Sequence, residues 1–129
     1  MRLYDHLVDQ PRPSLRIVAV SMDCADHNEL ASFYTRLLDG TLLWTHEKAA
    51  AVEASGVVLV MQRTEDYRPP VWPGTSIVHL DLHGDAQTGE FEQRAVALGA
   101  QLAQMQPDPR WRVLLDPAGH PFCITPFTP

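Results

Sequence analysis

The chain repeats its own pattern of residues at a fixed interval. Residues 17–26, IVAVSMDCAD, match residues 77–86, IVHLDLHGDA, at an offset of 60 positions. Each segment opens with Ile-Val, alternates for about six residues and then reaches an Asp. The helical stretches that follow, 28–38 and 88–98, keep the same offset. A repeat of this length restricts the fold to one assembled from two equivalent units.

Each half continues with the same order of predicted elements, a helix and then about three strands. The predicted strands after the helices are residues 41–47, 49–54 and 57–63 in the first half, and 101–106, 111–116 and 122–125 in the second. Gly56 and the run 117–120 supply the turns before the last strands. We therefore predict an α+β fold of two tandem βαβββ units, whose curved mixed sheets surround a central groove with the helices outside. The alternative is a two-layer α+β domain whose halves are alike by coincidence.

Prolines separate the two halves. Residues 64–76, TEDYRPPVWPGTS, contain three prolines and a glycine, which exclude a continuous helix or a central strand. We predict a linker at 64–76, between unit one at 15–63 and unit two at 77–127. Residues 1–14 form an N-terminal extension to this single domain.

Candidate end signals flank both predicted helices. Asp26 and Asp85 stand before them and have side chains that favour N-cap positions. Gly40 and Gly99 stand after them, where helices commonly end in a left-handed residue. These residues predict where each helix begins and ends.

Charge and hydropathy exclude several classes of partner. The net charge is −6 and the ten Lys and Arg residues are scattered, which argues against binding to nucleic acid or to anionic membranes. No stretch reaches the roughly 20 apolar residues of a transmembrane helix, and the N-terminus lacks the apolar segment of a signal peptide. We expect a cytoplasmic protein in which Cys24 and Cys123 are reduced thiols.

The first strand of each unit has one apolar face and one polar face. Side chains alternate along a strand, so the apolar face is expected to lie under the helix. The opposite faces together have Ser21, Asp23, His79, Asp81 and His83. Two such sheets that curl toward each other would line a groove with these groups. The alternative is that this face is simply solvated, as in many antiparallel sheets.

Several motifs at matching positions resemble one known superfamily. They are Asp26-x3-Leu30-Ala31-x-Phe33-Tyr34-x2-Leu37-Leu38, Val78-His79-Leu80-Asp81-Leu82, Leu98-Gly99-Ala100, and Asp116-Pro117-x-Gly119-His120-x-Phe122-Cys123. With them the chain resembles the glyoxalase, bleomycin-resistance and extradiol-dioxygenase superfamily, also called the vicinal oxygen chelate fold. The second motif with Phe122-Cys123 is similar to its glyoxalase-like subgroup.

The resemblance implies a metal centre whose ligands this chain largely lacks. Metal-using relatives place four ligands, usually His and Glu, at positions that correspond to Ala19, about Val60, His79 and Cys123. Only His79 is an unchanged ligand type, and Ala19 and Val60 cannot bind a metal. We therefore expect no metal cofactor of the usual kind. A divalent metal bound by His79 and Cys123, with help from Asp81, is the alternative.

The remaining candidates have binding or catalytic roles in the predicted groove. His79 with Asp81 is predicted as a catalytic acid/base pair, or else as a hydrogen-bonded histidine that orients a ligand. Cys123 is either a nucleophile or a small core residue. Trp72, in the linker, is a candidate pocket lid or dimer contact. The predicted ligand-binding residues are Ser21, Asp23, Trp44, Gln62, His79, Trp111 and Cys123.

Two functions follow from these residues. The first is a protein that binds or sequesters a small, partly aromatic molecule in the groove without the usual metal, as drug-binding members of the superfamily do. The second is a lyase- or isomerase-type enzyme that uses His79 with Asp81, or a divalent metal with an atypical ligand set. The resemblance also implies a homodimer in which sheet edges meet. The missing ligands all fall in unit one, so we expect the chemistry to lie on the face of unit two.

Overall fold

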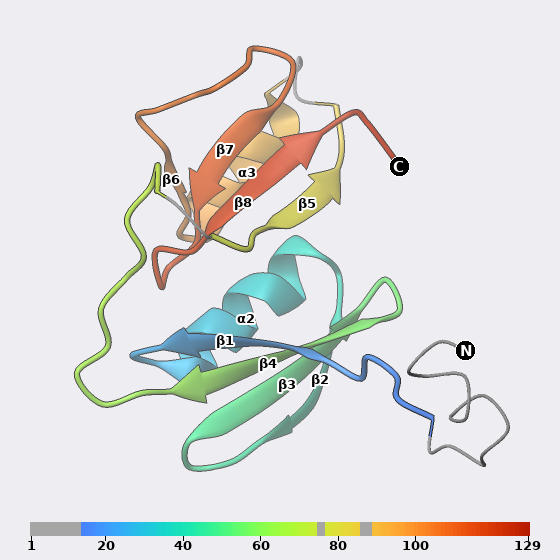
Figure 1. Cartoon of the computed structure of the whole chain (residues 1–129), viewed down its shortest axis with the longest axis vertical. Coiled ribbons are helices and arrows are strands. Elements are labelled where there is room, and N and C mark those ends of the chain that lie inside the picture. Colours follow the sequence, from blue (N-terminus) through green and yellow to red (C-terminus); the bar gives the residue numbers. More distant parts are fainter. Residues whose placement is uncertain (1–13, 75–76, 86–88) are drawn as a thin grey trace, which may run out of the picture.

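A computed structural model describes residues 14–74, 77–85 and 89–129 of the chain. In chain order its elements are β1 (Val20–Cys24), α2 (His27–Leu37), β2 (Thr41–Thr45), β3 (Ala49–Ala54), β4 (Val57–Arg63), β5 (Leu80–His83), α3 (Glu90–Leu98), β6 (Gln101–Leu102), β7 (Arg112–Leu115) and β8 (Pro121–Thr125). They form two four-stranded mixed sheets with the orders β1-β4-β3-β2 and β5-β8-β7-β6 (Figure 1). The predicted α+β fold of two βαβββ units is confirmed.

Unit one shows how the alternating sequence folds. Met22 and Cys24 of β1 are buried, whereas Ser21 and Asp23 between them are exposed. Asp26 is the N-cap of α2, as predicted, because its carboxylate accepts hydrogen bonds from the backbone N–H groups of Asn28 and Glu29 at 3.1 and 3.0 Å. Strand β1 therefore places its apolar residues under the helix and its polar residues on the opposite face.

The predicted glycine at the end of α2 has a different role. The left-handed residue after this helix is Asp39, with φ 51°, and not Gly40. Gly40 is needed for space, since a Cβ atom there would lie 2.7 Å from the carbonyl oxygen of Glu53. In α3 the prediction is confirmed, because Gly99 is the C-cap with φ 123°.

Unit two departs from the prediction at two places. Helix α3 begins at Glu90 after Gly89, which offers no side-chain cap, so the prediction of Asp85 as its N-cap is wrong. Strand β6 ends at Leu102 instead of at residue 106. The Gln106 side chain binds where β6 ends. The N–H of Ala103 still donates to the carbonyl oxygen of Val113 at 3.1 Å. The N–H of Val113, however, donates to Oε1 of Gln106, and the Gln106 amide donates to the carbonyl oxygen of Ala103, both at 2.8 Å, so the side chain replaces one of the two backbone bonds of this pair.

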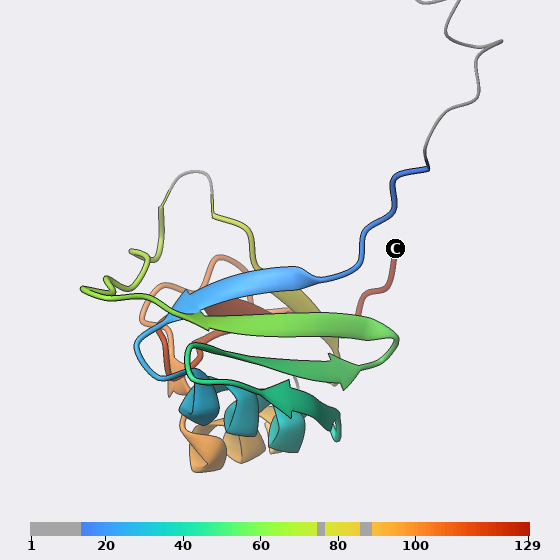
Figure 2. The same ribbon diagram turned by 90° about the horizontal axis from the view of Figure 1, so that it is seen from below.

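The two units share one hydrophobic core. Helices α2 and α3 lie side by side on the same side of the sheets (Figure 2). Phe33 and Tyr34 of α2 pack against Phe122 of β8, with ring centroids 5.9 and 6.3 Å apart. The Tyr34 hydroxyl also donates to the buried carboxylate of Asp116 at 2.6 Å. Aromatic packing and one buried hydrogen bond therefore fix unit two against α2.

The opposite faces of the sheets are free of helices and become the candidate site. Strands β1 and β4 of unit one pair in parallel, as do β5 and β8 of unit two. Positions in the first pair can therefore be compared directly with positions in the second pair. Ser21 pairs with Val60 in unit one, and Asp81 pairs with Cys123 in unit two. Across the described residues, none of the helices has the length and apolar character of a membrane span.

Candidate functional site

Three potential ligand side chains meet on the helix-free face of unit two. Asp81 of β5 and Cys123 of the neighbouring strand β8 are direct partners in the sheet. His79, two residues before Asp81, points the same way, and its Nε2 lies 3.2 Å from Oδ1 of Asp81. One ligand atom from each of the three residues lies within 4.8 Å of the others. We call His79, Asp81 and Cys123 the unit-two triplet.

Burial differs sharply within the triplet and determines the state of the thiol. Cys123 is 5 % exposed, whereas the side chains of His79 and Asp81 are 34 % and 65 % exposed. Burial, followed by the negative charge of Asp81 and a hydrogen bond to it, raises the pKa of Cys123 to about 11. The thiol is therefore protonated at neutral pH and donates to the carboxylate. This environment does not activate a nucleophile, because catalytic thiols need a lowered pKa.

Aromatic side chains surround the triplet and form a cavity of about 620 Å³. Trp72 lies on one side, where its indole N–H donates to the carbonyl oxygen of Met105 at 3.1 Å. Its ring also meets the ring of His79 edge-on, with centroids 6.4 Å apart. Trp111 and Phe127 form another T-shaped pair at 6.3 Å. The described residues that line this cavity are Trp72, His79, Asp81, His83, Pro107, Trp111, Val113, Cys123, Thr125, Phe127, Thr128 and Pro129.

The predicted site residues of unit one lie elsewhere. Ser21 and Asp23 line a separate cavity of about 390 Å³ at the junction of the units, together with His79 and His120. Gln62 is exposed, and Trp44 stacks on His46 with ring centroids 4.8 Å apart. The structure therefore brings together His79, Asp81, Trp111 and Cys123 in the cavity of about 620 Å³. Ser21 and Asp23 share the other cavity with His79, and Trp44 and Gln62 lie outside both.

One aromatic residue of the cavity, Phe127, was missed by reasoning from the sequence, because it follows the last strand, where no periodic pattern continues. Trp72 was predicted as a pocket lid or a dimer contact, and it lines the cavity. The sole signal for Phe127 is an aromatic residue close to Trp111 in a chain with few aromatics. The His83 side chain was placed correctly on the polar face, and it lines the cavity.

The donor set decides which metal centre the chain could hold. The residues of unit one in register with Asp81 and Cys123 are Ser21 and Val60. Together with Ala19 they supply no imidazole, thiolate or carboxylate, so a four-ligand centre shared by both units does not fit. The unit-two triplet alone offers three potential ligand atoms, which lie within 4.8 Å of one another. In a tetrahedral zinc site N and O ligands are about 3.3 Å apart, close to the 3.2 Å between His79 and Asp81.

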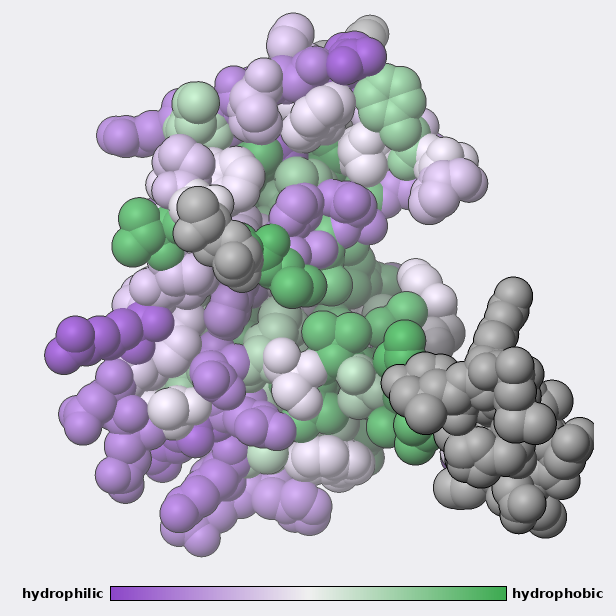
Figure 3. All heavy atoms as spheres, viewed as in Figure 1, coloured by the Kyte–Doolittle hydropathy of each residue, from purple (hydrophilic) through white to green (hydrophobic). Residues whose placement is uncertain are grey.

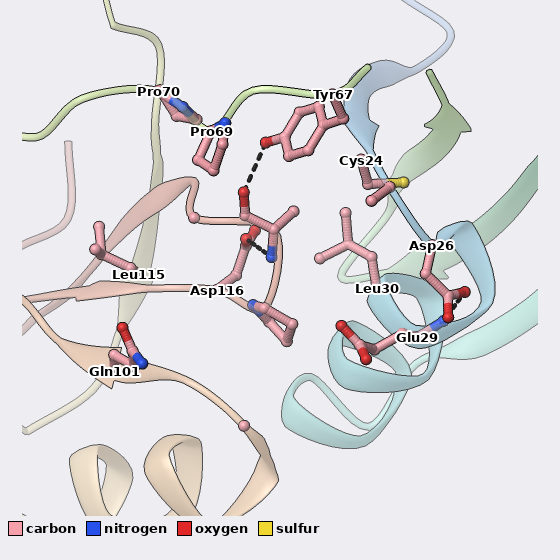
Figure 4. Close-up of a pocket in the computed structure, with 15 residues that line it drawn as sticks. Cys24, Asp26, Glu29, Leu30, Tyr67, Pro69, Pro70, Gln101, Leu115 and Asp116 are labelled. Atoms are coloured by element: carbon pink, nitrogen blue, oxygen red, sulfur yellow. Dashed lines mark hydrogen bonds between the residues drawn. The ribbon is translucent and has the colours of Figure 1, made fainter. Parts of the chain in front are cut away.

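A third cavity lies between the units, and three of its lining residues, Tyr67, Asp116 and Ala118, are linked by hydrogen bonds. Figure 4 shows the Tyr67 hydroxyl donating to the carbonyl oxygen of Ala118, at 2.6 Å, and the Asp116 carboxylate accepting from the N–H of Ala118, at 2.9 Å. Burial raises the pKa of Asp116, although hydrogen bonds from Tyr34 and the backbone oppose the shift. The Tyr67 hydrogen bond joins the linker to unit two, and the hydrogen bond from Tyr34 to Asp116 joins α2 to unit two.

A family model and several solved structures are similar to this chain. The family model described as a glyoxalase-like domain matches residues 19–125. Among curated proteins no sequence matches significantly. A solved structure of a mutant of the fosfomycin resistance protein FosX from Listeria monocytogenes, complexed with Mn(II) and 1S,2S-dihydroxypropylphosphonic acid, is similar with a TM-score of 0.70 and 14% identity over 88% of this chain and 90% of that one.

Two further structures have the same fold. A glyoxalase-related enzyme from Fulvimarina pelagi has a TM-score of 0.64 and 19% identity over 84% of this chain and 86% of that one. A lactoylglutathione lyase from Agrobacterium tumefaciens has a TM-score of 0.59 and 16% identity over 88% and 94%. The family model covers most of the chain, and the duplicated fold agrees with it. This chain therefore belongs to the glyoxalase-like domain family of the vicinal oxygen chelate superfamily.

Proposed function

We propose that this protein binds a small, partly aromatic molecule in the cavity of unit two, and that binding does not use the four-ligand metal centre of its superfamily. One observation carries the proposal, namely that Trp72, Trp111 and Phe127 surround a polar floor made by the unit-two triplet. Ligand sites commonly combine apolar and aromatic walls with a few polar groups that fix orientation. A volume of about 620 Å³ lies within the range of small-molecule sites.

Intrinsic fluorescence tests this proposal directly. Small phenyl and indole compounds are titrated into the protein while tryptophan emission is followed. We expect saturable quenching that Trp111→Leu weakens, because Trp111 lines the cavity. Trp44→Phe is the matched control, because Trp44 lies on β2 and stacks on His46 away from the cavity. Quenching that depends on Trp44 and not on Trp111 would overturn the proposal.

We propose that the protein works as a homodimer in the cytoplasm. Apolar side chains gather over β1 and the segment before it on the face seen in Figure 3. Leu15, Ile17 and Val18 in this segment are 98, 93 and 68 % exposed, and Val78 before β5 is 87 % exposed. A second copy would remove this apolar surface from water. Light scattering coupled to size-exclusion chromatography measures the oligomeric state. A monomer at all protein concentrations would contradict the proposed homodimer.

A second candidate function is acid/base catalysis by His79. The observation that favours it is the 3.2 Å contact between His79 Nε2 and Asp81 Oδ1, which would fix the imidazole tautomer. His79 can then take or give a proton at its other ring nitrogen. Turnover of a bound ligand that His79→Gln abolishes, while affinity is kept, would establish this function. A ligand that binds tightly and is not chemically changed would contradict catalysis and support the binding function.

The unit-two triplet could also bind a zinc-type ion, which would supply Lewis-acid chemistry at the cavity floor. His79, Asp81 and Cys123 would hold the ion, and binding would require loss of the Cys123 proton. Cobalt(II) titration tests this assignment without any assay of activity, since a thiolate ligand gives a near-ultraviolet charge-transfer band. The band should disappear in Cys123→Ser and persist in Cys24→Ser. A cobalt spectrum with no thiolate band would exclude the triplet as a metal site.

A further inference from the structure

The described side chains that line the unit-two cavity include an acidic group but no Lys or Arg. Among the described residues that line it, Asp81 is the one acidic side chain. The Asp81 side chain is 65 % exposed, its Oδ1 lies 3.2 Å from Nε2 of His79, and it also accepts a hydrogen bond from the Cys123 thiol. The cavity therefore presents a negative charge to a ligand.

The walls have π-faces of the kind that attract cations. Tryptophan binds cations best among the aromatic residues, and the hydrogen bond from Trp72 to Met105 holds that ring in place. Trp111 and Phe127 already receive one cation, because the guanidinium carbon of Arg110 lies 5.4 Å from both ring centroids. These rings are therefore arranged in a way that accommodates positive charge.

Arg110 itself does not reverse the charge of the cavity. Its guanidinium forms two hydrogen bonds with the Asp108 carboxylate, at 2.9 and 2.8 Å. The pair lies in the turn before β7, and neither residue lines the cavity. Apart from the two histidines, Asp81 is thus the one ionisable carboxylate or basic side chain among the described residues that line the cavity.

We infer that this cavity selects small aromatic molecules that carry a positively charged ammonium group, with Asp81 as the counter-ion and Trp72 and Trp111 as the walls. The inference rests on the proposed function, because it specifies the ligand of the same site. It also separates this chain from the FosX structure to which it is similar, since the molecule in that structure is a phosphonic acid. A phosphonate would bring its negative charge against Asp81 with no basic side chain in the lining to offset it.

Three ligands of nearly equal size and different charge test the inference. Phenyltrimethylammonium is cationic, tert-butylbenzene is its neutral isostere, and phenylphosphonate is anionic. Affinities are measured by tryptophan fluorescence at about pH 8. We expect the cation to bind about tenfold more tightly than the neutral isostere, since cation–π attraction and the charge of Asp81 act together. Phenylphosphonate should bind most weakly.

The variants separate a local charge effect from the net charge of the protein. Asp81→Asn keeps the shape of the side chain and should remove the preference for the cation. Glu47→Gln is the matched control, because it removes the same charge from an exposed position between β2 and β3 and should leave the preference intact. On the unaltered protein, added salt should weaken binding of the cation and leave binding of the neutral isostere unchanged, which tests the idea even if a variant folds poorly.

The possible results distinguish failure of the inference from failure of the proposed binding function. Equal affinities for the three ligands, or tightest binding of phenylphosphonate, would overturn the inference and leave the proposed binding function standing. A preference for the cation that survives Asp81→Asn would also overturn it. Failure of all three ligands to bind would overturn the proposed function, and the inference with it.

Discussion

The buried hydrogen bond from Tyr34 to Asp116 allows a quantitative test of how the two units are held together. In Tyr34→Phe the ring and its packing remain, and only the hydroxyl that donates to Asp116 at 2.6 Å is lost. Tyr34 is 0% exposed and Asp116 is 4% exposed, so water cannot replace the donor. A buried hydrogen bond to a charged group contributes about 1.5–3 kcal/mol, so we expect a cost of about 2 kcal/mol. With about 2.1 cal/mol/K of unfolding entropy per residue, Tm should fall by about 7 °C.

The pH dependence of this cost gives the sharper test. Burial raises the pKa of Asp116, and the bond from Tyr34 acts in the opposite direction, so Tyr34→Phe should raise this pKa further. A hydrogen bond that lowers the pKa of a carboxyl group in the folded state stabilises the folded protein at pH values above that pKa. This stabilisation is lost as the pH falls through the pKa. The cost should therefore be largest at neutral pH and should shrink in acid. Because the net shift of Asp116 is upward, ionisation of this carboxyl itself weakens the fold as pH rises.

Urea denaturation followed by circular dichroism measures the cost at several pH values. Tyr67→Phe is the comparison, since the Tyr67 hydroxyl donates to the neutral carbonyl of Ala118 and should cost about 1 kcal/mol. A cost for Tyr34→Phe below about 0.5 kcal/mol, which is less than the usual range for any buried bond, would refute the reasoning. A cost of the same size at neutral and acid pH would refute the assignment of an ionised Asp116.

Two further predictions concern single residues. Asp81→Asn should lower the pKa of Cys123 from about 11, because the Asp81 carboxylate raises that pKa, and should speed alkylation of the thiol at least about threefold at neutral pH. Peptide mass spectrometry measures the alkylation, with Cys24, whose pKa is also about 11, as the internal control. Equal acceleration of both thiols would count against the triplet. Gly119→Ala should destabilise the protein by more than Gly56→Ala, since both residues have positive φ but only at Gly119 would a Cβ meet Pro69, at 2.7 Å. Chemical denaturation compares the two, with about 1–2 kcal/mol expected from the backbone alone, and equal costs would show that the contact with Pro69 relaxes freely.

Most of the fold was predictable because its signals are local and occur twice. Alternation in β1 and β5 indicates which residues lie under a helix, and the offset of 60 positions pairs the units. Element ends were less predictable, because they depend on particular side chains at a distance. Gln106 binds Val113 where β6 ends, and no pattern in the sequence indicates that contact.

Part of the lining of the unit-two cavity was predictable from the sequence. Period-two alternation places His79 and Asp81 on one face, and the pairing of β5 with β8 adds Cys123. The same reasoning added Ser21 and Asp23, since it assumed that both sheets line one groove. How far two units stand apart depends on packing between α2, Phe122 and Asp116, which a repeat does not encode. This packing leaves Ser21 and Asp23 in a separate cavity from Trp111 and Phe127.

The central claim is that unit two and Trp72 of the linker provide the binding site without residues of unit one. The indole N–H signals of the three tryptophans test it most directly. Each gives one resolvable nitrogen–proton NMR correlation, and Trp72 and Trp111 line the cavity whereas Trp44 lies on β2 of unit one. On titration with phenyltrimethylammonium, we predict progressive shifts of the Trp72 and Trp111 signals and a stationary Trp44 signal. A shift of Trp44 while the other two signals stay in place would contradict the account.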